Sequence, residues 1–373
     1  MQRLTGEQYE QLTHALLDAF ETRARLSRMV RYRLDRKLAT ISEAEELEQV
    51  VFSLIGRAEA EGWTQRLIAA ARESNPHNPA MLEFARQFGL ASTSIALPVL
   101  ERQVQSLYPY LDVAVWRERL GQIETQVCRV EIPVDGKLIS GTGFLLSPDL
   151  VMTNYHVMEA VILGEQGKTG GQGLAAPAKE VVLRFDFKRM GDGTVTNPGV
   201  QFRLASDWLV DSSPLSPVDY QVAKTGLPAL DQLDYALLRV AGEPGNQQPG
   251  GQTEPGGDAR GWIKFPDAPY NFVAHTPLFI MQHPRGWPLK LALEMDAVMG
   301  LNQNGTRVTY TTNTEPGSSG SPCFNANWDL VAIHHSGDPD FDPAHKPEYN
   351  EGIPIHTILA LLEKRGLKRQ LGL

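Results

Sequence analysis

The chain has 373 residues, 42% of them hydrophobic, and a formal net charge of −9 at pH 7. This length is sufficient for two or three domains with separate cores, and the composition excludes a chain that is disordered throughout. The acidic balance argues against nucleic acid as the main partner, and no run of about 18 apolar residues predicts a membrane span.

The cysteines and the first residues of the chain bear on its compartment. Cys128 and Cys323, the only two cysteines, lie in apolar segments that are typical of strands, so we expect buried thiols rather than a disulfide. The segment Met1–Glu7 lacks the apolar core of a signal peptide, and none is expected. Together these features predict a cytoplasmic protein.

Residues 1–90 are predicted to form a bundle of short amphipathic helices. Thr5 and Gln8 have the spacing of a capping box, and so do Ser42 and Glu45. Asn78-Pro79 predicts the start of the last helix, with asparagine as the cap. Such helices bury their apolar faces by packing together. Apolar residues at helical spacing follow these caps, among them Leu12, Leu16, Val50, Leu54, Leu67, Ile68, Leu82 and Phe84.

Four segments of this helical part resemble bacterial effector-associated domains: Leu12–Phe20, Met29–Leu34, Val50–Ile55 and Asn75–Pro79. These domains are death-fold-like adaptor modules, similar in kind to caspase-recruitment domains. The resemblance implies docking between like domains, which brings a fused effector to its sensor. The implied partner is a sensor or adaptor protein, such as an NLR-like ATPase, or a second copy of the chain docking through residues 1–90.

Charged side chains in residues 1–90 offer such docking a physical basis. A basic run could meet an acidic run of a neighbouring domain, although a solvated helix face explains each single charge equally well. Tyr32 is the one aromatic residue within the basic run, so nucleic-acid binding through stacked bases is not expected. The basic residues are Arg23, Arg25, Arg28, Arg31, Arg33, Arg36 and Lys37, and the acidic ones are Glu43, Glu45, Glu46 and Glu48.

Residues 91–121 are predicted to be a linker followed by a short helix. The linker spans about residues 91–110. Apolar residues at helical spacing favour a helix over about residues 111–123 that packs on the domain after it; they are Val113, Trp116, Leu120 and Ile123. The third segment, residues 122–373, changes to strand signals that begin at Thr125–Ile132.

Two stretches of residues 122–373 place an imidazole and a carboxylate beside buried strands. The segments Gly141–Leu146 and Val151–Val157 predict two strands joined by a turn, with His156 just after the second strand. Leu233–Val240 predicts another buried strand, with Asp234 at its start. Asp231 is an alternative for the same acidic role.

More short strands are predicted in this part of the chain. Two glycine-rich stretches, residues 164–173 and 242–257, indicate surface loops and lack the spacing of a phosphate-binding loop. Many short strands separated by turns favour paired antiparallel barrels. The further strands are expected at residues 180–185, 277–284, 292–294 and 307–311, and a terminal helix at residues 354–365.

The segment Glu315–Pro322 surrounds Ser319 with small residues. Glycine permits backbone angles that crowd other residues, so the hydroxyl can project while adjacent N–H groups point the same way. Clusters of this composition are usually ordinary turns. A serine hydroxyl becomes a nucleophile when a base takes its proton and a carboxylate fixes the tautomer of that base. His156 and Asp234 upstream are candidates for these two groups.

In this order, the three segments resemble those of the chymotrypsin/trypsin superfamily of serine proteases, over about residues 122–365. The resemblance implies an all-β double antiparallel β-barrel of chymotrypsin type after the all-α, death-fold-like bundle, with the active site between the barrels. It makes Ser319 the nucleophile, His156 the general base and acid, and Asp234 the orienting carboxylate. The N–H groups of Gly317 and Ser319 would form the oxyanion hole.

Ser318 departs from the trypsin pattern. Digestive trypsins have an aspartate before the nucleophile, and it pairs with a freshly cut amino terminus. With a serine in this place, we expect that zymogen switch to be absent. Control would then come from assembly through residues 1–90, from ordering of loops or from cleavage of the linker.

A second departure concerns the side chain recognised before the scissile bond. His334 together with Thr314 resembles the pocket of bacterial glutamyl endopeptidases. His335 and Ser336 are predicted to continue the pocket wall. Hydrogen-bond donors of this kind favour Glu, Asp or Gln before the cut. Alternatively, His334 packs beneath His335 as a structural residue, and Glu315 would oppose an acidic side chain if it pointed inward.

No metal ion or cofactor is expected. The four other histidines of residues 122–373 lack the spacing of metal ligands; these are His275, His283, His345 and His356.

The predicted function is that of a cytosolic serine endopeptidase recruited through a death-fold-like module and acting on a protein substrate. The resemblance places it in bacterial anti-phage defence or regulated cell death, with a gasdermin-like pore-forming effector as a candidate substrate. Two alternatives stay open. One is an adaptor whose protease fold is catalytically silent, and the other is a housekeeping quality-control protease that needs no recruiting partner.

Overall fold

The computed structural model describes residues 4–87, 112–170, 173–189, 196–222, 224–251, 257–340 and 346–372. The chain divides into two compact units, residues 1–102 and 103–373. The predicted linker at residues 91–110 and the predicted helix end at Gly89 lie outside the described residues. None of the described helices is both long enough and apolar enough to cross a membrane.

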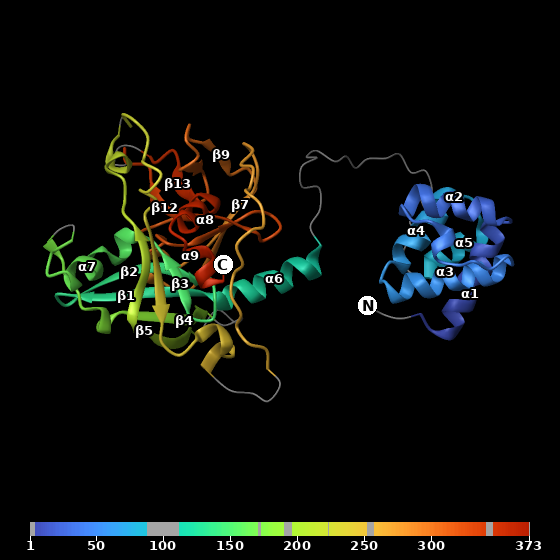
Figure 1. Cartoon of the computed structure of the whole chain (residues 1–373), viewed down its shortest axis with the longest axis horizontal. Coiled ribbons are helices and arrows are strands. Elements are labelled where there is room, and N and C mark those ends of the chain that lie inside the picture. Colours follow the sequence, from blue (N-terminus) through green and yellow to red (C-terminus); the bar gives the residue numbers. More distant parts are fainter. Residues whose placement is uncertain are drawn as a thin grey trace. The chain divides into compact units, whose positions relative to one another are not determined.

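The first unit is a helical bundle around a single apolar core (Figure 1). Helix α1 packs on α3 and α5, while α2 and α5 pack on α4. The core includes side chains that helical spacing predicted, among them Leu12, Leu16, Leu54 and Phe84, whereas Leu82 is 37% exposed and lies outside it. The helices are α1 (Gly6–Ala19), α2 (Arg23–Leu34), α3 (Leu47–Ala60), α4 (Thr64–Ser74) and α5 (Pro79–Gln87), with a 3-10 turn at Leu38–Thr40.

Two of the three predicted helix caps form in the structure, and the third does not. The capping box of Thr5 and Gln8 forms at the start of α1, and the Asn78 side chain accepts a hydrogen bond from the N–H of Met81 at 2.9 Å. The predicted box of Ser42 and Glu45 is wrong, because α3 begins only at Leu47. The Ser42 hydroxyl instead accepts a hydrogen bond from the N–H of Ala44, within the preceding turn.

The second unit begins with helix α6 (Val113–Gln126), which continues directly into the first strand, so the predicted boundary at residue 122 falls inside this helix. As predicted, α6 packs on the strands of the same unit that follow it. Its Trp116 ring lies 5.1 Å from that of Trp328 and 6.4 Å from that of Phe279, between ring centroids.

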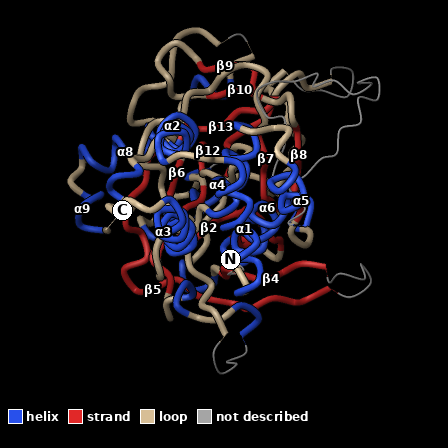
Figure 2. Tube along the Cα trace, turned by 90° about the vertical axis from the view of Figure 1, so that its right-hand side faces the viewer, coloured by secondary structure: helices blue, strands red, loops and turns tan. Residues whose placement is uncertain are grey.

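Six strands of the second unit form a closed antiparallel barrel in the order β1-β2-β3-β6-β5-β4. β5 is 18 residues long; its first half pairs with β4 and its second half with β6 (Figure 2). The sequence did not indicate this strand, because its exposed side chains are largely polar. The strands are β1 (Val127–Val134), β2 (Lys137–Leu145), β3 (Leu150–Thr153), β4 (Val182–Arg189), β5 (Thr196–Ser213) and β6 (Tyr235–Val240); helix α7 (Tyr155–Glu165) follows β3.

Seven strands form the second lobe, an antiparallel sheet in the order β8-β7-β11-β12-β13-β10-β9. The predicted fold class, a helical bundle followed by an all-β fold of chymotrypsin type, is confirmed. The strands are β7 (Leu278–Gln282), β8 (Lys290–Glu294), β9 (Val298–Leu301), β10 (Val308–Tyr310), β11 (Pro322–Phe324), β12 (Leu330–Gly337) and β13 (Asn350–Pro354); helices α8 (Ile355–Lys364) and α9 (Leu367–Leu371) follow.

The barrel and the second sheet share an apolar core, which fixes one lobe against the other. Phe144 and Leu237 of the barrel belong to the same buried cluster as Phe324 and Ile333 of the sheet. Both cysteines are buried free thiols, as predicted. Because these side chains are buried and closely packed, residues on the facing edges of the two lobes are held in a constant geometry.

Candidate active site

His156 and Asp234 lie at the same end of two paired strands. β3 and β6 are antiparallel with Thr153 opposite Ala236, so His156 leaves one strand where Asp234 enters the other. His156 Nδ1 lies 2.7 Å from Asp234 Oδ2, and the His156 backbone N–H donates to Asp234 Oδ1 at 2.9 Å. His156 stands in the first turn of α7, a helix that the sequence analysis had not predicted.

Asp234 is completely buried. Burial alone would raise the pKa of its carboxyl group, but the charges and hydrogen bonds of His156 and His335 hold that pKa well below its usual range. Its backbone carbonyl accepts a hydrogen bond from Asn154 Nδ2 at 2.9 Å. Asp231, the alternative acid, is exposed, and its backbone carbonyl accepts a hydrogen bond from Ser213. The geometry therefore associates Asp234, and not Asp231, with the imidazole.

The loop that carries Ser319 is held against β2 and the end of β3. The Thr142 N–H donates to Ser319 O at 2.8 Å, and the Thr142 hydroxyl donates to Gly317 O at 2.8 Å. Gly320 has a φ of +87°, and a Cβ atom there would lie 2.1 Å from Thr142 O and 3.2 Å from Asn154 N. Only glycine fits this close approach, which brings Ser319 beside the residues that lead into His156.

The backbone around Gly317 and Ser319, the predicted oxyanion-hole residues, is held by its own hydrogen bonds. The Pro316 carbonyl accepts a hydrogen bond from the Arg285 N–H at 2.6 Å, and the Ser318 N–H donates to Glu315 O at 2.9 Å. Gly317 has a φ of +96°. Within the described residues, neither the Gly317 N–H nor the Ser319 N–H donates a hydrogen bond, so both are available to a developing oxyanion.

Glu315 and Arg285 form an ion pair beside this loop. Arg285 Nη2 donates to Glu315 Oε1 at 3.2 Å, and Arg285 Nε also contacts the carboxylate. The pair is largely exposed, so its contribution to stability is small. Its effect is local, because it occupies the carboxylate that the sequence analysis had considered as an opponent of acidic substrates.

Of the predicted pocket residues, two are half-buried and two are buried. Thr314 and Ser336 are half-buried, and the Thr314 hydroxyl donates to Asn350 Oδ1 at 2.9 Å. His334 is buried, and its Nδ1 lies 2.7 Å from the Tyr310 hydroxyl. His335 does not line a pocket with its ring nitrogens: Nδ1 lies 2.6 Å from Asp234 Oδ2, and the side chain is fully buried.

The protonation state of His334 follows from its surroundings. Burial, together with the neighbouring charges of His335 and His156, lowers the pKa of His334 to about 3. The ring is therefore neutral near pH 7. If the Tyr310 hydroxyl donates to Nδ1, the single ring proton resides on Nε2.

Among the residues that the structure describes, two groups of acid and imidazole side chains come close enough together to suggest metal ligands: His156 with Asp234 and His335, and Asp219 with His335 and Glu351. In the first group the imidazole nitrogens lie 2.7 and 2.6 Å from one carboxylate oxygen. Two donors of one tetrahedral metal ion are about 3.4 Å apart, given bond lengths of about 2.1 Å. These distances are those of hydrogen bonds.

A separate cavity of about 1300 Å³ lies along α6 and the segment of residues 258–273. Trp262, Tyr270 and Trp328 are among its lining residues, and His156, Asp234 and Ser319 are not. It therefore adds nothing to the geometry of the three residues.

Sequence reasoning did not single out several residues that shape this site. Thr142 and Asn154 lie in the segments Gly141–Leu146 and Val151–Val157, which were recognised as strands near His156. Their polar side chains, in otherwise apolar segments, could have marked them as residues that support the site. Arg285, Asp219 and Arg307 lie far away in the chain, and no local pattern marks them. Their roles depend on contacts that only the folded chain makes.

Comparisons with known proteins place both units. A model of effector-associated domain 1 matches residues 2–89, and a model of the trypsin-like peptidase domain matches residues 141–333. An uncharacterised protein of Sinorhizobium fredii is 25% identical over 288 residues, which is 73% of this chain and 37% of that protein. A probable serine protease of Lysobacter enzymogenes is 26% identical over 220 residues, 58% of this chain and 30% of that protein. The chain thus spans about a third of the length of these curated relatives.

Solved structures of similar chains are proteases. A protease of M. tuberculosis in its active form is 18% identical, with a TM-score of 0.40, over 70% of this chain and 94% of that one. A Glu endopeptidase is 16% identical, with a TM-score of 0.37, over 64% of this chain and 90% of that one.

Proposed function

We propose that this chain, which belongs to the trypsin-like peptidase domain family, is a serine endopeptidase with His156, Asp234 and Ser319 as its catalytic triad. The observation that carries this proposal is the pairing of a buried, ionised Asp234 with His156 at 2.7 Å, beside a loop that can hold Ser319 only because residue 320 is glycine.

The proposed mechanism has two steps, acylation of Ser319 and hydrolysis of the acyl-enzyme, and His156 acts as base and then as acid in each. His156 Nε2 takes the proton of Ser319 as its oxygen attacks the scissile carbonyl, and Asp234 stabilises the imidazolium that forms. The N–H groups of Gly317 and Ser319 bind the oxyanion. His156 then protonates the leaving amine, and water, activated by the same imidazole, releases the acyl group from Ser319.

Labelling of the full chain with a fluorophosphonate tests the triad. We expect one adduct per chain, on Ser319, that is absent in Ser319→Ala and formed at least 100-fold more slowly in His156→Ala. Equal labelling of Ser319→Ala would assign the nucleophile elsewhere. No labelling of the wild type, alone or with a recruiting partner, would favour the catalytically silent adaptor.

For specificity, we propose that Thr314 and His334, with Ser336 in the same wall, bind Glu, Asp or Gln before the scissile bond. A neutral His334 donates a hydrogen bond through Nε2 when Tyr310 donates to Nδ1. The Arg285–Glu315 ion pair supports the proposal, because it removes an unpaired negative charge from the neighbourhood. Cleavage of a peptide library is the test, and a sharp preference for Arg or Lys would refute the pocket while leaving the triad intact.

The proposed cellular role rests on the domain at residues 2–89. We take residues 1–90 as a recruitment domain, 91–121 as linker and helix, and 122–373 as the protease. The recruitment domain would dock on a like domain of a cytoplasmic sensor or adaptor, or on a second copy, in bacterial defence or regulated cell death, with a gasdermin-like effector as the proposed substrate.

Deleting residues 1–90 tests this role. We expect cleavage that depends on the upstream signal to be lost, while labelling of Ser319 in the purified protein persists. If the truncated protein still cleaves its cellular substrates without any signal, a housekeeping protease explains the chain better.

A further inference from the structure

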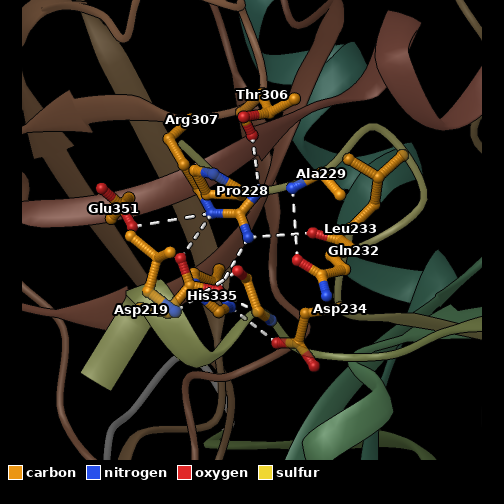
Figure 3. Close-up of polar contacts among 12 residues, drawn as sticks. Asp219, Pro228, Ala229, Gln232, Leu233, Asp234, Thr306, Arg307, His335 and Glu351 are labelled. Carbon is orange, nitrogen blue, oxygen red and sulfur yellow. Dashed lines mark hydrogen bonds and ion pairs between the residues drawn. The ribbon is translucent and has the colours of Figure 1, made fainter. Parts of the chain in front are cut away.

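A buried row of alternating charges leads away from Asp234 into the second lobe (Figure 3). Each member contacts the next, and all five side chains are at most 4% exposed. The row runs Asp234, His335, Asp219, Arg307, Glu351.

His335 occupies the position between two carboxylates. Its Nδ1 lies 2.6 Å from Asp234 Oδ2, and its Nε2 lies 3.3 Å from Asp219 Oδ2, an ion-pair distance without the angles of a hydrogen bond. A neutral imidazole would present a lone pair to one of these two anions. Both nitrogens therefore carry protons. Burial alone would lower the pKa of His335, but Asp219 and Asp234 raise it to about 9.

Asp219 is itself fixed by a guanidinium group. Arg307 Nε donates to Asp219 Oδ1 at 3.0 Å, and Nη2 donates to Asp219 Oδ2 at 2.7 Å, the two-pronged contact that arginine makes best. Arg307 Nη2 also donates to Gln232 O at 3.0 Å, two residues before Asp234. The same guanidinium thus anchors both the partner of His335 and the backbone that leads to Asp234.

At the far end of the row, Glu351 contacts two cationic side chains, Arg307 and Lys224. Arg307 Nε lies 3.7 Å from Glu351 Oε1, and Lys224 Nζ lies 2.6 Å from Glu351 Oε2. Positive and negative groups therefore alternate without a break from Asp234 to Lys224. Because each buried charge has an opposite neighbour, a cationic His335 is compatible with complete burial.

We propose that His335 is a positioning residue of the active site, a buried cation that holds one oxygen of Asp234 and shares it with His156. This inference rests on the proposed triad. Asp219 and Arg307 keep His335 in place. The arrangement gives Asp234 a fixed orientation and offsets part of its negative charge, so that less of this charge remains to stabilise an imidazolium at His156.

The other titratable groups around His335 are few. The ring of His156 lies 6.2 Å away, between centroids, and the neutral His334 is its neighbour on β12. Tyr155 and Tyr220, whose pKa values burial raises, also interact with Asp234. His334, Tyr155 and Tyr220 are all neutral near pH 7, so none of them adds a charge at Asp234.

The test is the pH dependence of the rate at which a fluorophosphonate modifies Ser319 in the full chain. His335→Gln keeps a donor for Asp234 and removes the charge. We expect the midpoint of its acidic limb to move upward by about one pH unit, the effect of one charge about 6 Å away in a partly screened site. His275→Gln is the matched control, since His275 also contacts a carboxylate, Asp296, but is exposed; its profile should equal that of the wild type.

A midpoint that stays in place or falls in folded His335→Gln would overturn the proposal. ¹⁵N NMR of the wild-type chain provides a measurement that does not depend on folding of the variant: one of the nine histidines should remain doubly protonated at pH 8, and finding none would equally overturn it. Absence of labelling in the wild type would count against the triad instead, and the NMR result would still decide the charge of His335.

Discussion

Asp234 accepts three hydrogen bonds through its two carboxylate oxygens, two of them from His156 and one from His335. Because the group is fully buried and ionised, its hydrogen bonds determine both the tautomer and the orientation of the His156 ring. The sequence pattern placed the carboxylate correctly at the start of β6. It could not reveal that a second imidazole shares the same oxygen.

Replacing Asp234 by asparagine should impair catalysis far more than folding. The amide can donate a hydrogen bond to His156 Nδ1 and so favour the wrong tautomer, and we expect kcat to fall about 10⁴-fold. Steady-state cleavage of a peptide ester measures this loss. Asp231→Asn is the matched control: its side chain is exposed three residues earlier, and activity within twofold of the wild type is expected. The reverse pattern would transfer the role to Asp231.

The charge on His335 should make the protease unit less stable in alkali. A histidine whose pKa is raised to about 9 in the folded state, against about 6.5 when unfolded, adds stability that is fully present below pH 6.5 and is lost as pH rises through 9. Thermal unfolding between pH 6.5 and 10 should therefore show a loss on the order of 3 kcal/mol. His335→Gln should flatten this dependence, and an equally steep decline in that variant would exclude His335 as its source.

At the scale of secondary-structure elements, the sequence predicts best those features that depend on neighbouring residues alone. The Thr5 capping box and the Asn78 cap depend on neighbouring residues and were predicted correctly. Ser42 offered the same local pattern, yet its hydroxyl bonded within a turn instead. β5 and α7 escaped prediction, because exposed polar residues hide the strand and the apolar run after His156 is too short to distinguish a helix from a strand.

Gly320 should not tolerate a side chain. In Gly320→Ala the Cβ would lie 2.1 Å from Thr142 O, on a backbone with a φ of +87°. We expect displacement of the Ser319 loop, loss of fluorophosphonate labelling by at least 100-fold and destabilisation of about 2 to 4 kcal/mol.

Gly136→Ala is the control for Gly320→Ala. It introduces the same backbone strain at a positive φ but no steric clash of the new Cβ atom. Gly136 has a φ of +75° with open space around it, so its substitution should cost only about 1 kcal/mol and leave labelling unchanged. Comparable damage in the two variants would mean that backbone conformation alone, and not the close approach to Thr142, governs residue 320.

At the scale of the whole molecule, the chain consists of two compact units with separate cores. The change from helical to strand periodicity along the sequence indicated both, because each periodicity reflects burial within one unit. The row from His335 to Glu351 could not be anticipated in this way. Its members come from η4 (Pro217–Tyr220), the turn before β10, and strands β12 and β13, and only the packing of the two lobes brings them together.

Unfolding of the full chain should occur in two independent transitions. Thr5→Ala removes one cap of α1 and should lower only the midpoint of the helical unit, by the few degrees that correspond to about 1 kcal/mol. Scanning calorimetry in the Ser319→Ala background avoids self-cleavage during heating. A single transition that shifts as a whole would show that the two units unfold together.

The Pro316 carbonyl, already held by the Arg285 N–H, has a consequence for any recruiting partner. If Gly317 and Ser319 form the proposed oxyanion hole, this hydrogen bond already holds their loop, and a partner has little conformational change left to induce. Such a partner would speed cleavage chiefly by tethering, which raises the effective concentration of the substrate to the millimolar range. The gain would then be largest for substrates with a high KM and would vanish for those that already saturate the enzyme.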